Sequence, residues 1–224
     1  MFCAGIDYMD LMSTMGNAIA PGSDSADGQR DDIAGKAKFI SSMIALLQEP
    51  FNTMARCPKP IVAAVHSGVI GAGVDMISAV DIRYASSDAY FSIREVAIGM
   101  AADVGTLQRL PKIVGNDSLV RELAFTGTDM PASEAKEFGL ISRVFETPEK
   151  TVEGALELAR KIASRSPVAV QGTKISLNYS REHTIEDGLQ FMQIWNMSML
   201  QSEDLLTATT AVATKQESPE FADL

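Results

Sequence analysis

Three acidic residues, Asp75, Glu95 and Asp103, lie in segments that are otherwise almost free of charge. Asp75 sits in the glycine-rich, apolar stretch 68–77, whereas Glu95 and Asp103 flank the apolar run 96–102. A carboxylate in apolar surroundings loses hydration, so its pKa rises and its proton becomes available near neutral pH. Three such acids within one glycine-punctuated segment are typical of a site for acid/base catalysis.

The same acids also have a structural interpretation. Asp103 precedes the start of an expected helix near Val104 and so has the position of an N-cap. Arg83 or Arg94 could be the ion-pair partner of another of these carboxylates. Spacing alone does not separate the two interpretations, but they differ in one expectation. A catalytic set must line a common cavity.

Two small-residue turns supply candidate hydrogen-bond donors. The stretch 68–73 is expected to be a glycine-rich turn between a buried strand at 61–66 and a helix that runs to about Val80. Amides at a helix N-terminus lack intrahelical partners, so they can stabilise a developing oxyanion. The glycines are also consistent with a crossover that needs small residues for steric reasons alone. A second turn, at 1–7, could bring further amides to the same place.

The acids and the amide donors together are the groups that proton transfer next to a carbonyl group requires. Removing a proton beside a thioester carbonyl requires a base at the carbon and donors at the oxygen that becomes an enolate. A further acid can then return a proton at a distant carbon or activate a water molecule.

Composition narrows the classes of partner. A chain of 224 residues fits one domain, and its net charge of −10 argues against nucleic acid, because phosphate backbones need a basic surface. Cys3 and Cys57 are too few for a disulfide framework. No apolar run reaches the roughly 20 residues of a membrane-spanning helix. The termini carry no recognisable targeting signal.

Neither a metal nor a redox cofactor is predicted. His66 and His183 have no second His, Cys or carboxylate at ligand spacing. Gly71 and Gly73 match only part of a dinucleotide fingerprint, because Met76 stands where the third glycine would be.

The remaining pattern predicts an α/β core over residues 1–145 and a helical region over 146–224. A long helix is expected before the first buried strand, kinked or restarted at Pro50, after an exposed loop at 16–32. Further strands are expected at 81–85, 89–92 and 140–145. Further helices are expected from about Val104, over 116–127 and 131–139, and at about 149–165, 167–180, 184–200 and 202–213.

Several segments in order carry a family resemblance. They resemble the enoyl-CoA hydratase/isomerase (crotonase) superfamily, and they are residues 2–7, 58–66, 71–75, 81–84, 106–111 and 166–170. The resemblance implies a crotonase-like spiral of ββα units with a helical C-terminal trimerisation region. It also implies an acyl-CoA thioester as substrate and a homotrimer or homohexamer.

Within the family, the acids are most similar to those of the Δ3,5-Δ2,4-dienoyl-CoA isomerases. Hydratases have glutamate, glutamate and glycine at the positions of Asp75, Glu95 and Asp103, whereas the dienoyl isomerases resemble this chain. The resemblance implies a proton shuttle that moves the double bonds of a 3,5-dienoyl-CoA in fatty-acid β-oxidation. It assigns the oxyanion hole to the amides of Ile6 and Ala72.

Two other functions are also candidates, and two features of the chain depart from the family pattern. An enoyl-CoA hydratase is the second candidate function, and a catalytically silent oligomeric scaffold is the third. Ala72 replaces the glycine usual in the family, so strain is expected if that position needs a positive φ. Family members carry a further segment before the position of Phe2, so an incomplete first sheet is expected. The family resemblance implies a mitochondrial or peroxisomal location.

Overall fold

The computed structural model describes residues 1–19, 32–216 and 219–224. In this part of the chain, two small sheets form the centre of the molecule. One is the parallel sheet β1-β3-β6, made of β1 (Val62–Val65), β3 (Ile82–Ser86) and β6 (Arg143–Phe145). The other has the order β2-β4-β5, with β2 (Gly68–Ile70) parallel to β4 (Tyr90–Ser92) and β5 (Met130–Pro131) antiparallel to it.

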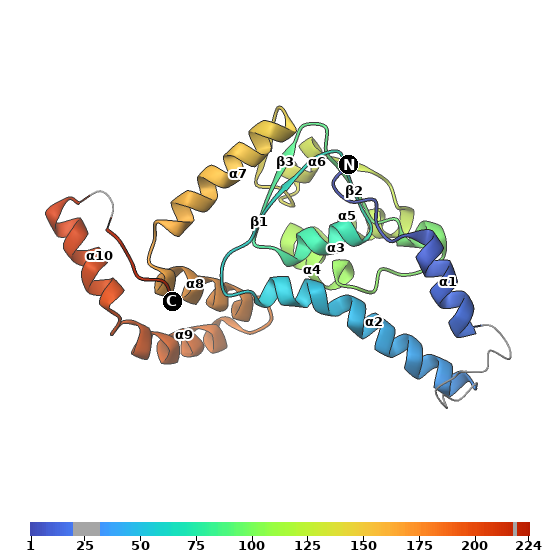
Figure 1. Ribbon diagram of the computed structural model, residues 1–224, viewed down its shortest axis with the longest axis horizontal. Coiled ribbons are helices and arrows are strands. Elements are labelled where there is room, and N and C mark those ends of the chain that lie inside the picture. Colours follow the sequence, from blue (N-terminus) through green and yellow to red (C-terminus); the bar gives the residue numbers. More distant parts are fainter. Residues whose placement is uncertain (20–31, 217–218) are drawn as a thin grey trace.

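Helices surround these sheets (Figure 1). The N-terminal part has α1 (Tyr8–Ile19), α2 (Ile33–Arg56), α3 (Ala72–Ala79), the 3₁₀ helix η1 (Glu95–Ile98) and α4 (Thr106–Val114). They are followed by α5 (Asp117–Thr126), α6 (Ala132–Glu137), α7 (Pro148–Ala163), α8 (Pro167–Ser180), α9 (Ile185–Met199) and α10 (Glu203–Thr214).

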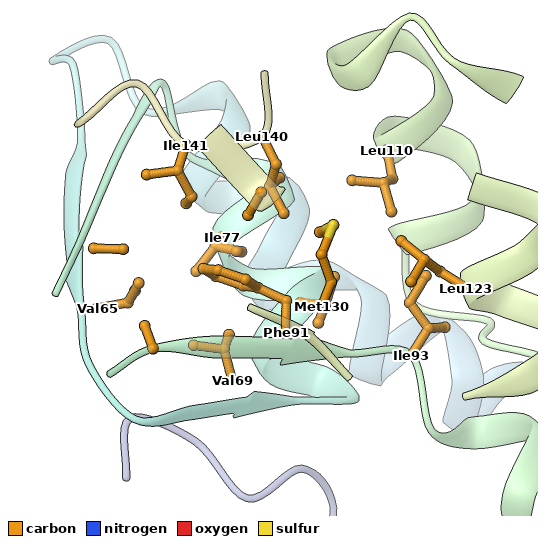
Figure 2. Close-up of a cluster of buried hydrophobic side chains, with 14 of the residues drawn as sticks. Val65, Val69, Ile77, Phe91, Ile93, Leu110, Leu123, Met130, Leu140 and Ile141 are labelled. Carbon is orange, nitrogen blue, oxygen red and sulfur yellow. The ribbon is translucent and has the colours of Figure 1, made fainter. Parts of the chain in front are cut away.

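The hydrophobic core joins the strands to α3, α4 and α5. Figure 2 shows Phe91 of β4 between Ile77 of α3 and Met130 of β5. The core side chains labelled in that view are Val65, Val69, Ile77, Phe91, Ile93, Leu110, Leu123, Met130, Leu140 and Ile141. This packing fixes α3 and α4 relative to β2 and β4. Helix α3 carries Asp75, β4 precedes Glu95, and α4 follows Asp103.

Helix α7 packs against β1, β3 and β6, so it covers one sheet of the core. The helices after it lie at one end of the molecule, on the opposite side from α1 (Figure 1). Helix α8 is attached to the core by Lys174, whose Nζ donates to Asp81 Oδ2 at 2.7 Å. The boundary at 145/146 between core and helical region stays a prediction.

Two predictions for the N-terminal helices are wrong in part. The segment 16–32 was expected to be a loop, but residues 16–19 end α1, and residues 20–31 lie outside the described part. The start of α1 has a local cause, because Asp7 Oδ1 accepts from the Met9 and Asp10 amides at 2.8 and 3.3 Å. Pro50 was expected to kink or restart the long helix; α2 continues through it without a restart, and the kink stays a prediction. The proline removes one amide donor at an exposed position, which the packing of α2 tolerates.

The prediction of a turn over residues 68–73 is also wrong in part. Residues 68–70 form β2, which pairs with β4, rather than part of a turn, and Gly68 leaves room for the Tyr90 side chain. A Cβ at Gly68 would lie 2.8 Å from Tyr90 Oη. The short strand β5 and the 3₁₀ helix η1 were not predicted. By contrast, α5 begins and ends as expected, with Asn116 as N-cap and Gly127 as C-cap.

Candidate active site

The N-terminal segment lies beside β2 and brings the two predicted turns together. The amides of Phe2 and Cys3 donate to Gly68 O at 3.1 Å, and the Ile70 amide donates to Cys3 O at 3.0 Å. Cys3 is therefore paired in parallel with Val69. Because the two segments run in the same direction, the turn after Cys3 lies next to the turn after Ile70.

Gly5 and Gly71 form the contact between these turns. Both have a positive φ, +90° and +51°. A Cβ at Gly5 would lie 3.3 Å from Ile70 O, and a Cβ at Gly71 would lie 3.7 Å from the Gly5 Cα. Larger residues at these two positions would push the turns apart as well as strain the backbone.

The residues after these glycines are Ile6 and Ala72, the predicted oxyanion donors. Within the described residues, neither amide N–H donates to another protein group. Ala72 is the first residue of α3, where amides have no intrahelical acceptor. The expected strain at Ala72 is absent, because Gly71 adopts the positive φ instead.

A cavity of about 190 Å³ contains all five predicted site residues in its lining. They are Ile6, Ala72, Asp75, Glu95 and Asp103. The three acids thus line one common cavity, which a catalytic set requires. Their individual roles remain predictions.

Asp75 is fully buried at 0 % exposure on α3. Its Oδ1 accepts from the Thr106 amide at 2.6 Å, so it holds the first residue of α4, while its Oδ2 has no partner. Burial raises the pKa of Asp75 above its ordinary value, although the hydrogen-bonding groups of Thr106 and the charge of Arg109 act in the opposite direction. Asp75 therefore combines a helix-anchoring contact with one free carboxylate oxygen.

Glu95 is the first residue of η1, and its Oε2 is buried without a partner. A Cβ at Gly71 would lie 3.3 Å from Glu95 Oε1, so this carboxylate lies directly over the turn that leads to Ala72. Burial raises the pKa of Glu95, and the charges of Asp75 and Asp103 raise it further. Its neighbour Arg94 pairs with Asp129 at 2.7 Å and not with Glu95.

Asp103 is half-buried in the segment between η1 and α4. The structural interpretation as an N-cap is wrong, because α4 begins at Thr106 with Gly105 in the capping position. Its carbonyl oxygen accepts from Gln48 Nε2 at 2.6 Å. The side chain therefore has no capping role and belongs to the cavity lining.

Helix α2 forms the wall of the cavity that the sequence did not predict. The helical spacing of apolar residues from Met43 to Phe51 predicts an apolar stripe on one face of this helix, but it does not predict that the stripe borders a cavity. In the structure α2 has no fully buried residue. The members of the stripe that line the cavity are Met43, Ile44, Leu47 and Phe51. Their periodicity was visible in the sequence, whereas the empty space beside them was not.

The raised pKa of Glu95 predicts a pH-dependent effect on stability. Its neutral form is favoured in the folded state, so its stabilising contribution is complete below its ordinary pKa of 4.5 and is lost as pH rises through the folded value. Glu95→Gln replaces the carboxylate with an amide that stays neutral at every pH, so the stability of the variant does not fall as pH rises through this pKa. We expect the variant to have a higher free energy of unfolding than the wild type at pH 7, with the difference shrinking toward pH 4.5.

Denaturant unfolding at several pH values between 4.5 and 7.5 measures this difference. Glu157→Gln, at an exposed position of α7, is the matched control and should change little at any pH. A wild type that is more stable than Glu95→Gln at pH 7, or a difference independent of pH, would contradict the expectation.

Comparison with known proteins places the chain in a family. The family model for enoyl-CoA hydratase/isomerase matches residues 9–222. The chain belongs to this family. The fold agrees: an enoyl-CoA hydratase from Bacillus anthracis superposes with a TM-score of 0.77 at 27% identity, covering 85% of this chain and 74% of that one. The predicted crotonase-like α/β fold is therefore confirmed.

Two curated relatives of this family member carry the same activity name. The mitochondrial Delta(3,5)-Delta(2,4)-dienoyl-CoA isomerase of Homo sapiens is 50% identical over 97% of this chain and 63% of its own length. The peroxisomal enzyme of that name from Arabidopsis thaliana is 42% identical over 100% of this chain and 76% of its own length. The chain thus spans 63% of the length of the human relative.

Across residues 1–19, 32–216 and 219–224, no group of three or more His, Cys, Asp or Glu side chains is arranged to hold a metal ion. No helix in the described ranges has the length and apolar character needed to cross a bilayer.

Proposed function

We propose that this protein isomerises 3,5-dienoyl-CoA thioesters to 2,4-dienoyl-CoA thioesters. The observation that carries the proposal is the common cavity of Glu95, Asp103 and the Ile6 and Ala72 amides. It is supported by the dienoyl-CoA isomerase names of the relatives, which are 50% and 42% identical. The amides and carboxylates supply both halves of the reaction, so the proposal requires no cofactor.

In the proposed mechanism, the thioester oxygen lies between the Ile6 and Ala72 amides. One carboxylate removes a proton from C2, and the resulting dienolate is stabilised by the two donors. The other carboxylic acid delivers a proton at C6. C2 and C6 are too far apart for one short carboxylate to serve both easily, which is the reason for a pair, Glu95 and Asp103. Either order of the two roles is compatible, because coupled carboxylates titrate together.

Asp75 is proposed to orient and polarise rather than to transfer a proton. Its Oδ1 is occupied by the Thr106 amide, and its charge raises the pKa of Glu95. The apolar wall on α2 is proposed to contact the acyl chain. Its members Met43, Ile44 and Leu47 face the same cavity as the acids.

Two substrates tested separately distinguish the candidate functions. We expect the purified protein to convert a 3,5-dienoyl-CoA to the conjugated 2,4-dienoyl-CoA, followed by its ultraviolet absorbance. A hydratase would instead convert a 2-enoyl-CoA to a 3-hydroxyacyl-CoA, followed by chromatography. Turnover of the 2-enoyl-CoA alone would favour the hydratase, and turnover of neither would favour the silent scaffold.

The proposal includes a homotrimer or homohexamer in mitochondria or peroxisomes, the compartments named for the relatives. Large apolar side chains are exposed along the C-terminal helices, as expected for a surface that contacts another copy. They include Leu177, Ile185, Leu189, Ile194, Met197, Leu206 and Val212.

A further inference from the structure

The backbone around Asp103 is held by side chains from three helices. Gln48 Nε2 of α2 donates to Asp103 O at 2.6 Å. Arg109 Nη1 of α4 donates to Val104 O at 3.4 Å, and Asp75 Oδ1 of α3 accepts from the Thr106 amide at 2.6 Å. The segment lies outside any strand or helix, so these contacts fix where the Asp103 side chain begins.

Of these contacts, the one from Gln48 acts directly on the Asp103 peptide. Gln48 is half-buried on α2 and follows Leu47 of the cavity wall. One turn later on the same helix, Asn52 Oδ1 accepts from Arg109 Nη2 at 2.6 Å. Helix α2 therefore holds the segment twice, once at Asp103 itself and once through Arg109.

We propose that Gln48 is a positioning residue for Asp103. By holding the Asp103 carbonyl against α2, it fixes the rotation of that peptide and hence the direction of the carboxylate in the cavity. This inference rests on the proposed isomerase function, in which Asp103 exchanges a proton with the substrate. Displacement of a reacting group by about 1 Å is enough to lower a rate by roughly 100-fold.

The position of Gln48 also connects the acyl-chain wall with the acid. Met43, Ile44 and Leu47 line the cavity on one face of α2, and Gln48 extends from the adjacent position to the Asp103 peptide. An acyl chain seated against α2 would therefore contact the same helix that orients Asp103. Gln48 does not line the cavity, so its loss should affect turnover more than binding.

The test is Gln48→Met, which keeps a similar side-chain length and removes the donor. We expect kcat for the 3,5-dienoyl-CoA to fall by roughly 10- to 100-fold, consistent with the misplacement of one reacting group. KM should change by no more than about threefold. In an Asp103→Asn background, the same substitution should change the residual turnover little, because the group that it positions is already lost. Gln108→Met, at an exposed position of α4, is the matched control.

An unchanged kcat in Gln48→Met would overturn the inference. So would an equal fold loss in the native and Asp103→Asn backgrounds, because that result indicates a general structural role. Amide hydrogen exchange of residues 101–106 in the substrate-free protein gives an answer that does not depend on activity. Faster exchange in Gln48→Met supports the contact, and unchanged exchange overturns it. Absence of isomerase activity in the wild type would instead reject the proposed function and, with it, the catalytic part of this inference.

Discussion

Glu95→Gln and Asp103→Asn are each expected to lower the isomerase turnover number by roughly 10²- to 10⁴-fold, the usual contribution of a positioned acid or base. Each amide has nearly the shape of the carboxylate that it replaces but cannot accept or deliver the proton. Glu95 Oε2 is buried without a partner, so its substitution breaks no hydrogen bond of that atom. The loss should therefore appear in kcat, measured as the rate of formation of the 2,4-dienoyl-CoA.

Two controls distinguish a loss of proton transfer from damage to the binding site or the fold. An unreactive saturated acyl-CoA should bind both variants with a dissociation constant within a few-fold of the wild type. Glu49→Gln, on α2 but outside the cavity lining, should keep near-normal turnover. Near-normal turnover in both acid variants would show that the carboxylate mechanism is wrong. Normal turnover in Asp103→Asn alone would indicate that Asp103 is incidental, as in the hydratase alternative.

The sequence predicted the parts of this site whose chemistry is local. Asp75, Glu95 and Asp103 stand out because a charge in an apolar segment is costly unless it has a use or a partner. The start and end of α5 were predicted because Asn116 and Gly127 act on neighbouring backbone groups. Local signals of this kind do not depend on how the rest of the chain folds.

Contacts between segments that are far apart in the sequence could not be predicted from local sequence patterns. Nothing in the sequence states that Gly5 and Gly71 touch, because their contact requires residues 2–3 to lie beside β2. The stripe on α2 was visible, but periodicity describes an apolar face without identifying what covers it. The contact between Gln48 and Asp103 spans 55 positions and has no sequence signature.

Lys174→Met is expected to give the largest loss of stability among the substitutions considered. Lys174 is only 5 % exposed, and its Nζ lies 2.7 Å from Asp81 Oδ2 and 3.2 Å from Lys59 O. Asp81 Oδ2 also accepts from the Ile61 amide at 2.8 Å, so the pair joins α8 to the starts of β1 and β3. Removing the cation leaves a largely buried carboxylate uncompensated, which costs about 3 kcal/mol of unfolding free energy.

Denaturant unfolding at pH 7 measures this loss, and two comparisons identify its cause. Lys112→Met breaks an exposed 3.9 Å pair with Glu182 and should change the free energy of unfolding by no more than about 0.5 kcal/mol. If the uncompensated charge is responsible, adding Asp81→Asn to Lys174→Met should restore part of the stability. A Lys174→Met variant no less stable than Lys112→Met would contradict the anchoring role. Because Asn178 of α8 donates to Ala55 O of α2 at 3.2 Å, loss of this anchor should also loosen the helix that lines the cavity.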